Sequence, residues 1–160
     1  MDRGDGLLVR KIREGVVVDH IPPGRAFTVL RVLGLLPPEP YGGRIAIVIN
    51  AESGKMGRKD IVKIEGYGVE DLSLEALGIV APGATVNVVR EYKVVEKRKL
   101  DLPEEASGVL RCPNPTCITR KEREKATPRM RLVSRSPAKY RCVYCGSTIS
   151  EEEFQDLIAI

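Results

Sequence analysis

Short apolar runs separated by turn residues follow one another along the first hundred residues. Residues 15–22 (GVVVDHIP) are rich in β-branched side chains and reach a pair of prolines, which predicts a strand closed by a turn. Residues 26–36 (AFTVLRVLGLL) carry a broad apolar face, with Phe27, Leu30 and Leu33 in helical register. Two prolines follow this run, so it predicts an amphipathic helix that stops there.

The same two kinds of element recur after a loop at residues 37–43 (PPEPYGG). Residues 44–50 (RIAIVIN) and 60–66 (DIVKIEG) are β-rich runs with a glycine-containing connection, which favours an antiparallel hairpin. Residues 69–83 (VEDLSLEALGIVAPG) open with acidic residues and end in Pro-Gly, which predicts a second helix. Residues 84–97 (ATVNVVREYKVVEK) predict one or two closing strands. The order β-α-β-β-α-β is that of a ferredoxin-like split βαβ sandwich, an antiparallel sheet with two helices on one face.

The chain changes character near residue 103. Within residues 97–110 (KRKLDLPEEASGVL), strand-like patterning gives way to proline, acidic residues and glycine. We predict an α+β protein with an N-terminal domain at residues 1–102 and a small all-β C-terminal domain at residues 103–160. The second part has few large apolar side chains, and a core that small needs a metal or covalent staple.

Length and composition limit the protein to one or two small folded domains. The 160 residues are 42% hydrophobic and 30% charged, which excludes a large multidomain enzyme and a disordered chain. No run of about 18 uncharged apolar residues occurs, and the N-terminal residues are charged where a signal peptide would need an apolar segment. We therefore expect a cytoplasmic protein with no membrane segment.

Four cysteines give the strongest chemical signal. Cys112 and Cys117 form a C-x4-C pair, and Cys142 and Cys145 form a C-x2-C pair. Two such knuckles can bring four thiolates to about 2.3 Å from one zinc ion, a closed tetrahedral site that is structural because it leaves no position for a substrate. A redox dithiol at the C-x2-C pair and an iron–sulfur cluster remain alternatives.

Basic residues concentrate around these cysteines. The net charge is +4, yet residues 111–141 alone carry ten basic and two acidic side chains, while residues 1–110 are balanced. Such a segment would attract phosphate, so a zinc-ribbon nucleic-acid-binding protein is one reading. A solvated loop or a contact surface for a partner protein is the other, since Tyr140 and Tyr144 are sparse for base stacking.

The N-terminal part shows no catalytic grouping. It has no P-loop and no G-x-G-x-x-G after a strand. The single histidine, His20, follows Asp19 at a strand end, where a structural role is the more common one. The lysines on or beside the last strands are compatible with an anion or nucleotide site, although strand lysines usually belong to a solvated face; they are Lys59, Lys63, Lys93 and Lys97.

Several stretches together resemble one family, the regulatory chain of aspartate carbamoyltransferase. The stretches are VVVDHIPPG, SGKMGRKDIVKIE, APGATVN, YKVVEK, CPNPTC and CVYC. The resemblance implies a noncatalytic subunit in pyrimidine biosynthesis, whose N-terminal allosteric domain binds CTP as inhibitor or ATP as activator. It also implies a C-terminal domain with one structural zinc per chain that docks on the catalytic chain. Regulatory chains of the family pair through the allosteric domain, and three such dimers bridge two catalytic trimers.

The resemblance also implies a set of nucleotide-binding residues. Asp19 would accept a hydrogen bond from the ribose hydroxyls, and His20 would lie at the pocket edge. Lys63 would lie near ribose and phosphates, and Lys97 would be the principal triphosphate contact. The remaining matched positions are Asn87 on the phosphate side and Ile12, Val17, Tyr92 and Val94 around the base. The polarity is physically sound, because ammonium groups at one end bind phosphates and a carboxylate at the other binds vicinal hydroxyls.

One geometric condition accompanies this assignment. Strict alternation along a single strand would put Asn87 and Tyr92 on opposite faces of the sheet. Both can contact one ligand only if a bulge or a turn lies near Arg90.

Overall fold

The computed structural model describes residues 11–36 and 42–158, so most of the predicted loop at 37–43 lies outside the described part. The N-terminal elements follow the predicted order, with the last predicted run divided into two strands. They are β1 (Gly15–Ile21), α1 (Ala26–Val32), β2 (Ile45–Ser53), β3 (Gly57–Glu65), α2 (Leu74–Val80), β4 (Thr85–Arg90) and β5 (Lys93–Lys99).

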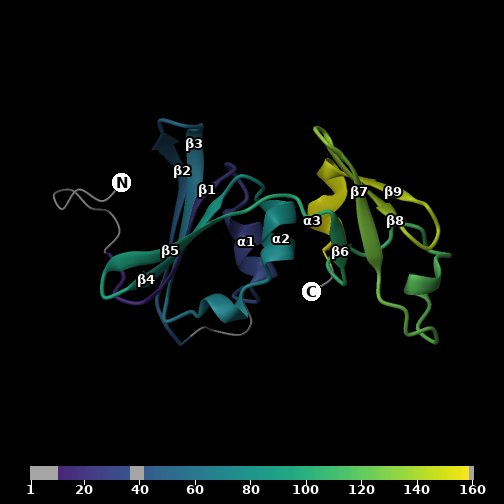
Figure 1. The fold of residues 1–160 in the computed structure, drawn as a ribbon, viewed down its shortest axis with the longest axis horizontal. Helices are drawn as coiled ribbons and strands as arrows, with labels where there is room; N and C mark the ends of the chain where they lie inside the picture. The colour runs from purple at the N-terminus through teal and green to yellow at the C-terminus, as the bar shows by residue number, and fades with distance from the viewer. Residues whose placement is uncertain (1–10, 37–41, 159–160) are drawn as a thin grey trace.

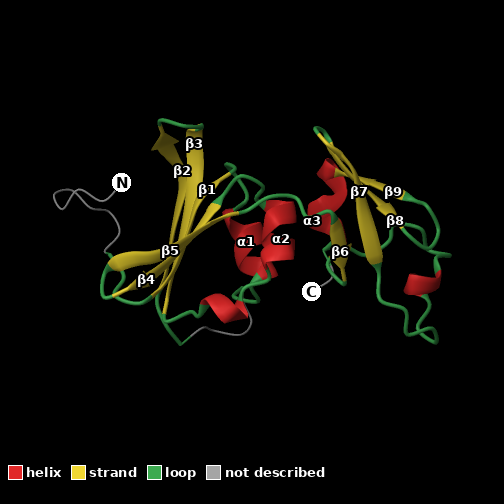
Figure 2. Ribbon diagram, viewed as in Figure 1, coloured by secondary structure: helices red, strands yellow, loops and turns green. Residues whose placement is uncertain are grey.

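These strands form one antiparallel sheet in the order β2-β3-β1-β4-β5. Helices α1 and α2 lie side by side on one face of it, between this sheet and the second part of the chain (Figure 1). The predicted antiparallel sheet with two helices on one face is therefore confirmed. Its other face is not covered by any described helix (Figure 2).

Both helices are shorter than predicted. Helix α1 ends at Val32 because Gly34 adopts a positive φ of 71°, a conformation that terminates helices. Phe27 was predicted on the inner face, yet 55% of it is exposed. The acidic start of the second predicted helix is a separate 3-10 turn, and α2 begins only after Ser73, whose hydroxyl accepts a hydrogen bond from the Ala76 amide.

The C-terminal part forms a second antiparallel sheet, as predicted. Its strands are β6 (Glu105–Ser107), β7 (Arg129–Arg135), β8 (Ala138–Cys142) and β9 (Thr148–Ser150), paired in that order. A one-turn helix, α3 (Phe154–Leu157), closes over the sheet. The rings of Tyr140 and Phe154 meet edge to face at 5.7 Å, and both residues are buried.

One continuous cluster of buried apolar side chains spans both sheets and the helices between them. Leu100 and Leu102 belong to it and lie in the segment between β5 and β6, where the predicted boundary falls. In the described ranges, no helix has the length and apolar character needed to cross a membrane.

Candidate ligand pocket and metal centre

A row of side chains crosses the first sheet on the face opposite the helices. The row runs in cross-strand register from Lys63 through Val17 and Asn87 to Lys97. The face is identified by Val17, because the flanking Val16 and Val18 are buried in the core beneath the helices and strand side chains alternate. Val17 instead packs with Ile61 and Val89 in a small separate cluster.

A pocket of about 300 Å³ opens over this row. Its lining consists of Lys11, Ile12, Val17, Asp19, Lys63, Asn87, Val89, Tyr92 and Val94. The structure thus brings seven of the nine residues expected to bind nucleotide into one pocket. The other two are neighbours of it. Lys97 is the exposed cross-strand partner of Asn87, and His20 follows Asp19 along the chain.

The hairpin between β4 and β5 meets the geometric condition set by the sequence. Glu91 and Tyr92 form a two-residue turn with φ of 51° and 65°, the conformation typical of tight hairpins. A register shift beyond the turn leaves Val95 as an extra residue, a β-bulge. The Tyr92 amide donates to the Arg13 carbonyl at 3.1 Å. Turn and bulge together bring Asn87, Tyr92 and Val94 to one pocket.

Two buried polar atoms at this site have no hydrogen-bond partner among the described residues. They are Asn87 Oδ1 and His20 Nδ1. Only 9% of Asn87 is exposed, and the nearest ionic neighbour of His20 Nδ1 is Asp19 Oδ2 at 3.8 Å. A buried acceptor without a donor costs folding free energy. Asn87 Oδ1 is therefore suited to accept a hydrogen bond from a ligand.

Lys59 was predicted only as one of the strand lysines compatible with an anion site, and it was not among the nine residues expected to bind nucleotide. Its ammonium lies 2.9 Å from Asp19 Oδ1, and its side chain is almost completely buried. A buried ion pair orients the carboxylate and leaves its second oxygen facing His20. Lys11 and Val89 also line the pocket without having been predicted. The register of Val89 opposite Val94 is a signal that would have found it.

A fully buried carboxylate, Asp60, lies beside the turn that follows Asp19. It accepts hydrogen bonds from the amides of Gly24 at 2.9 Å, Ala26 at 3.1 Å and Asn50 at 2.9 Å. Two irregularities adjoin it, since His20 and Asn50 have φ of 59° and 60° and interrupt the registers of β1 and β2. Asp60 thereby fixes the turn that follows Asp19.

The four cysteines converge beside the end of β8, whose last residue is Cys142. Their sulfur atoms all lie within 4.8 Å of one another. Cys112 and Cys145 are 3.5 Å apart at sulfur, and Cys117 and Cys142 are 3.8 Å apart. Bonds of about 2.3 Å to a tetrahedral zinc place neighbouring sulfurs about 3.8 Å apart, so the cluster fits such an ion. All four are free thiols rather than disulfides.

Local hydrogen bonds form the second cysteine knuckle and tune its thiols. The Cys142 amide donates to Ser147 O, and the Gly146 amide donates to Cys142 O. Hydrogen bonds from the hydroxyl and amide of Ser147 lower the pKa of Cys145 to about 6. Burial raises the pKa of Cys112 and of Cys142. The cluster thus has one exposed thiol that ionises readily and three buried ones, and a cation would draw all four into the thiolate form.

Two family models match successive parts of the chain. Residues 7–101 match the family model described as the aspartate carbamoyltransferase regulatory chain, allosteric domain. Residues 104–155 match the model for the metal binding domain of the same chain.

Curated relatives carry the same description. The aspartate carbamoyltransferase regulatory chain of Aeropyrum pernix is 70% identical over 156 residues, which cover 98% of either chain. Those of Hyperthermus butylicus and Thermofilum pendens are 53% and 51% identical over 99% and 95% of this chain, and over 98% and 94% of their own. The chain therefore belongs to the family of aspartate carbamoyltransferase regulatory chains, the noncatalytic chains of that enzyme.

Proposed function

We propose that the chain senses CTP and ATP in the pocket on the open face of its first sheet and holds the catalytic chain through its zinc module. In this proposal residues 1–102 form the nucleotide-binding domain and residues 103–160 the zinc-binding docking domain. The observation that carries it is the gathering of a carboxylate, lysines and a buried unpartnered amide oxygen in one pocket.

Charged residues at the two ends of the pocket would set the orientation of the bound nucleotide. Lys63 and Lys97 lie in one cross-strand row with Asn87 between them, which would bind a chain of phosphates. Asp19 lies one row away and would accept hydrogen bonds from ribose hydroxyls, with His20 beside it. The two ends cannot exchange roles, because a carboxylate repels phosphate.

The base would lie toward the hairpin. Ile12, Val17, Tyr92 and Val94 offer an apolar floor and an aromatic ring, with Tyr92 and Val94 more than half exposed. Backbone groups of this segment would read the exocyclic amine that cytosine and adenine share. CTP and ATP would then compete for one site.

Zinc is the metal we propose for the four thiolates, because their spacing fits it and because all four positions are filled by protein. When bound, the ion supplies no reaction and stabilises the module. Arg131 and Arg141 face each other across β7 and β8 near the metal ligand Cys142. They line a hollow of about 460 Å³ together with Val133 and Val143, each 41% exposed. Exposed valines between arginines favour an acidic protein surface over nucleic acid, so we propose this face as the docking surface.

Regulation would follow from linkage. A nucleotide that binds one quaternary state of the assembly more tightly shifts the equilibrium toward that state. We propose regulatory dimers, three of which bridge two catalytic trimers, as the assembly on which this operates.

Calorimetric titration of the zinc-loaded chain with CTP and with ATP tests the proposal. We expect competitive binding of both, with affinity reduced at least about tenfold in Lys97→Ala, since one charge-assisted contact contributes about 1.5–3 kcal/mol. Lys55→Ala is the matched control, because Lys55 is an exposed lysine in the β2–β3 turn. Absence of binding at low millimolar nucleotide would refute the sensing role.

A further inference from the structure

The segment that joins the two sheets, residues 100–104, is fixed at both ends by backbone hydrogen bonds. At the first sheet, the Leu100 amide donates to Ala84 O at 2.8 Å, and Leu100 O accepts from the Gly83 amide at 2.9 Å. At the second sheet, Glu104 O accepts from the Leu132 amide at 2.8 Å. A flexible linker would leave its backbone to water instead.

The partners that contact the connecting segment change between Asp101 and Leu102, from the first domain to the second. Asp101 lies against Gly78 of α2, whereas the carbonyls after it are bound by side chains of the second sheet. Within the segment itself, a hinge would form at this change of partner if no side chain bridged it; elsewhere the two parts share one apolar core and the bonds from Thr28 and Arg31 of α1 to Gln155.

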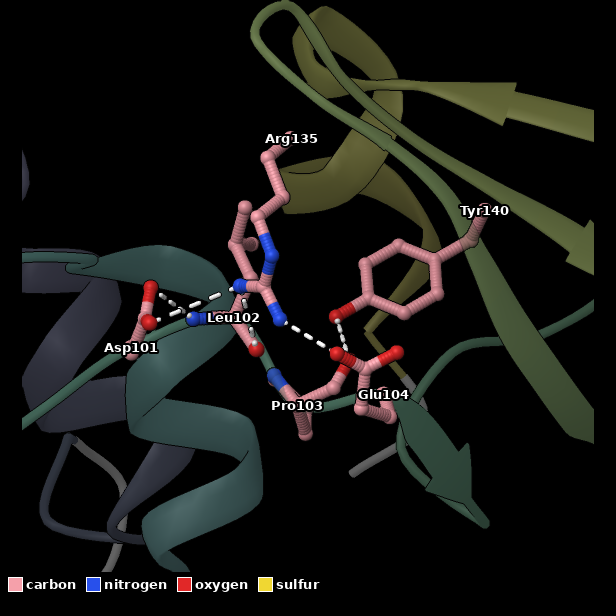
Figure 3. A network of polar contacts seen from close by, with 6 residues as sticks. All are labelled: Asp101, Leu102, Pro103, Glu104, Arg135 and Tyr140. Carbon is pink, nitrogen blue, oxygen red and sulfur yellow. Dashed lines mark hydrogen bonds and ion pairs between the residues drawn. The ribbon is translucent and has the colours of Figure 1, made fainter.

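Arg135 bridges that point. From the end of β7, its guanidinium reaches Asp101 Oδ2 at 3.4 Å, Leu102 O at 3.2 Å and Glu104 Oε1 at 2.5 Å (Figure 3). The fork of an arginine suits three acceptors at once, and lysine has no such geometry. One side chain therefore binds residues on both sides of the change.

Tyr140 fixes the next residue. Its ring is buried against Phe154. Its hydroxyl donates to the Pro103 carbonyl at 2.7 Å (Figure 3). Proline at this position restricts the backbone further, because its ring holds φ. Arg135 is the last residue of β7 and Tyr140 lies on β8, so the two strands of a single hairpin hold residues 101–104.

We propose that Arg135 and Tyr140 are positioning residues that lock residues 101–104 into a rigid strap, so that the sheet-and-helix domain and the zinc module move as one body. A rigid path is what carries a change at one site to another. The regulatory consequence rests on the proposed function. Loosening the strap would uncouple the catalytic chain from the nucleotide while leaving the nucleotide pocket intact.

Nitrogen-15 relaxation of the zinc-loaded full chain tests the strap directly. In the wild type, we expect amides of both domains to report one rotational correlation time. In the double variant Arg135→Ala/Tyr140→Phe, we expect the zinc module to tumble at least about 1.5-fold faster than the other domain, because the hinge is released. The Arg129→Ala variant is the matched control, since Arg129 lies on the same strand and contacts Glu105 rather than residues 101–104.

Two results would overturn the proposal: separate correlation times in the wild type, or one shared time in the double variant. Zinc content and dispersed amide resonances verify folding, and Tyr140→Phe alone keeps the ring if the double variant fails to fold. In the assembly with the catalytic chain, we expect the change in catalytic activity caused by nucleotide to be several-fold smaller in the double variant. The affinity for nucleotide should change less than twofold. If no nucleotide binds even the wild type, the proposed function fails, and relaxation still decides the strap.

Discussion

Gly78 of α2 lies against Asp101 so closely that a β-carbon at residue 78 would stand 2.1 Å from the Asp101 carbonyl oxygen. The helix can approach the connecting segment only because this position has no side chain. Alanine normally stabilises a helix interior by about 1 kcal/mol relative to glycine. Here the contact with a backbone atom reverses that sign.

We therefore expect Gly78→Ala to destabilise the protein by about 1–3 kcal/mol, the usual cost of overpacking. Urea denaturation followed by circular dichroism measures it. Gly54→Ala is the control, because nothing lies within 4 Å of a β-carbon there, and it should change stability little. Stabilisation by Gly78→Ala would show that the helix is free to shift.

Asp60→Asn should destabilise the first domain by about 2 kcal/mol or more. The fully buried carboxylate accepts hydrogen bonds from three backbone amides. The NH2 group of asparagine would face at least one of these N–H groups, and two donors cannot form a hydrogen bond with each other. Denaturation midpoints measure the loss. Glu52→Gln, an exposed acid-to-amide change on β2, should be close to neutral. Equal midpoints for both variants would contradict a structural role for Asp60.

Burial of Tyr140 predicts a loss of stability at high pH. Burial raises the pKa of this phenol above its usual value near 10. In the unfolded chain the phenol ionises first, so the unfolded state binds fewer protons, and stability falls as pH rises above about 10. Tyr140→Phe lacks this group and should cost about 1 kcal/mol at pH 8, the value of one hydrogen bond.

The free energy of unfolding of both proteins between pH 8 and pH 11 gives the measurement. The wild type should lose its advantage over Tyr140→Phe as pH rises. Tyr144→Phe, at an exposed tyrosine, should run parallel to the wild type. A constant difference between wild type and Tyr140→Phe would show that the phenol ionises alike in both states.

Metal removal should unfold the cysteine end of the second domain selectively. Structural zinc contributes on the order of 10 kcal/mol in small zinc domains, and few large apolar side chains are available there to replace it. With a chelator, all four thiols should become reactive and β8–β9 resonances should collapse, while CTP binding persists. Elemental analysis should give one zinc per chain. Iron in its place would support a cluster, and equal thiol reactivity with and without metal would argue against any metal.

Part of this protein could be read from its sequence because the signals are local. The cysteine pairs predict a metal cluster, since knuckle spacing alone directs two thiolates to one point, and the sulfurs do converge. The periodicity of the apolar runs likewise predicted the order of strands and helices. The turn near Arg90 followed from alternation, and the structure has it at Glu91–Tyr92.

Other features depend on contacts between distant segments, which only the tertiary structure decides. Lys59 is buried against Asp19 although strand lysines usually belong to a solvated face, and Phe27 is exposed although its spacing places it inward. In the proposed strap at residues 101–104, Arg135 contacts Asp101, which is 34 positions away in the sequence. Local propensity carries no information on such pairs, because their interaction arises only when folding brings together two segments that are distant in the sequence.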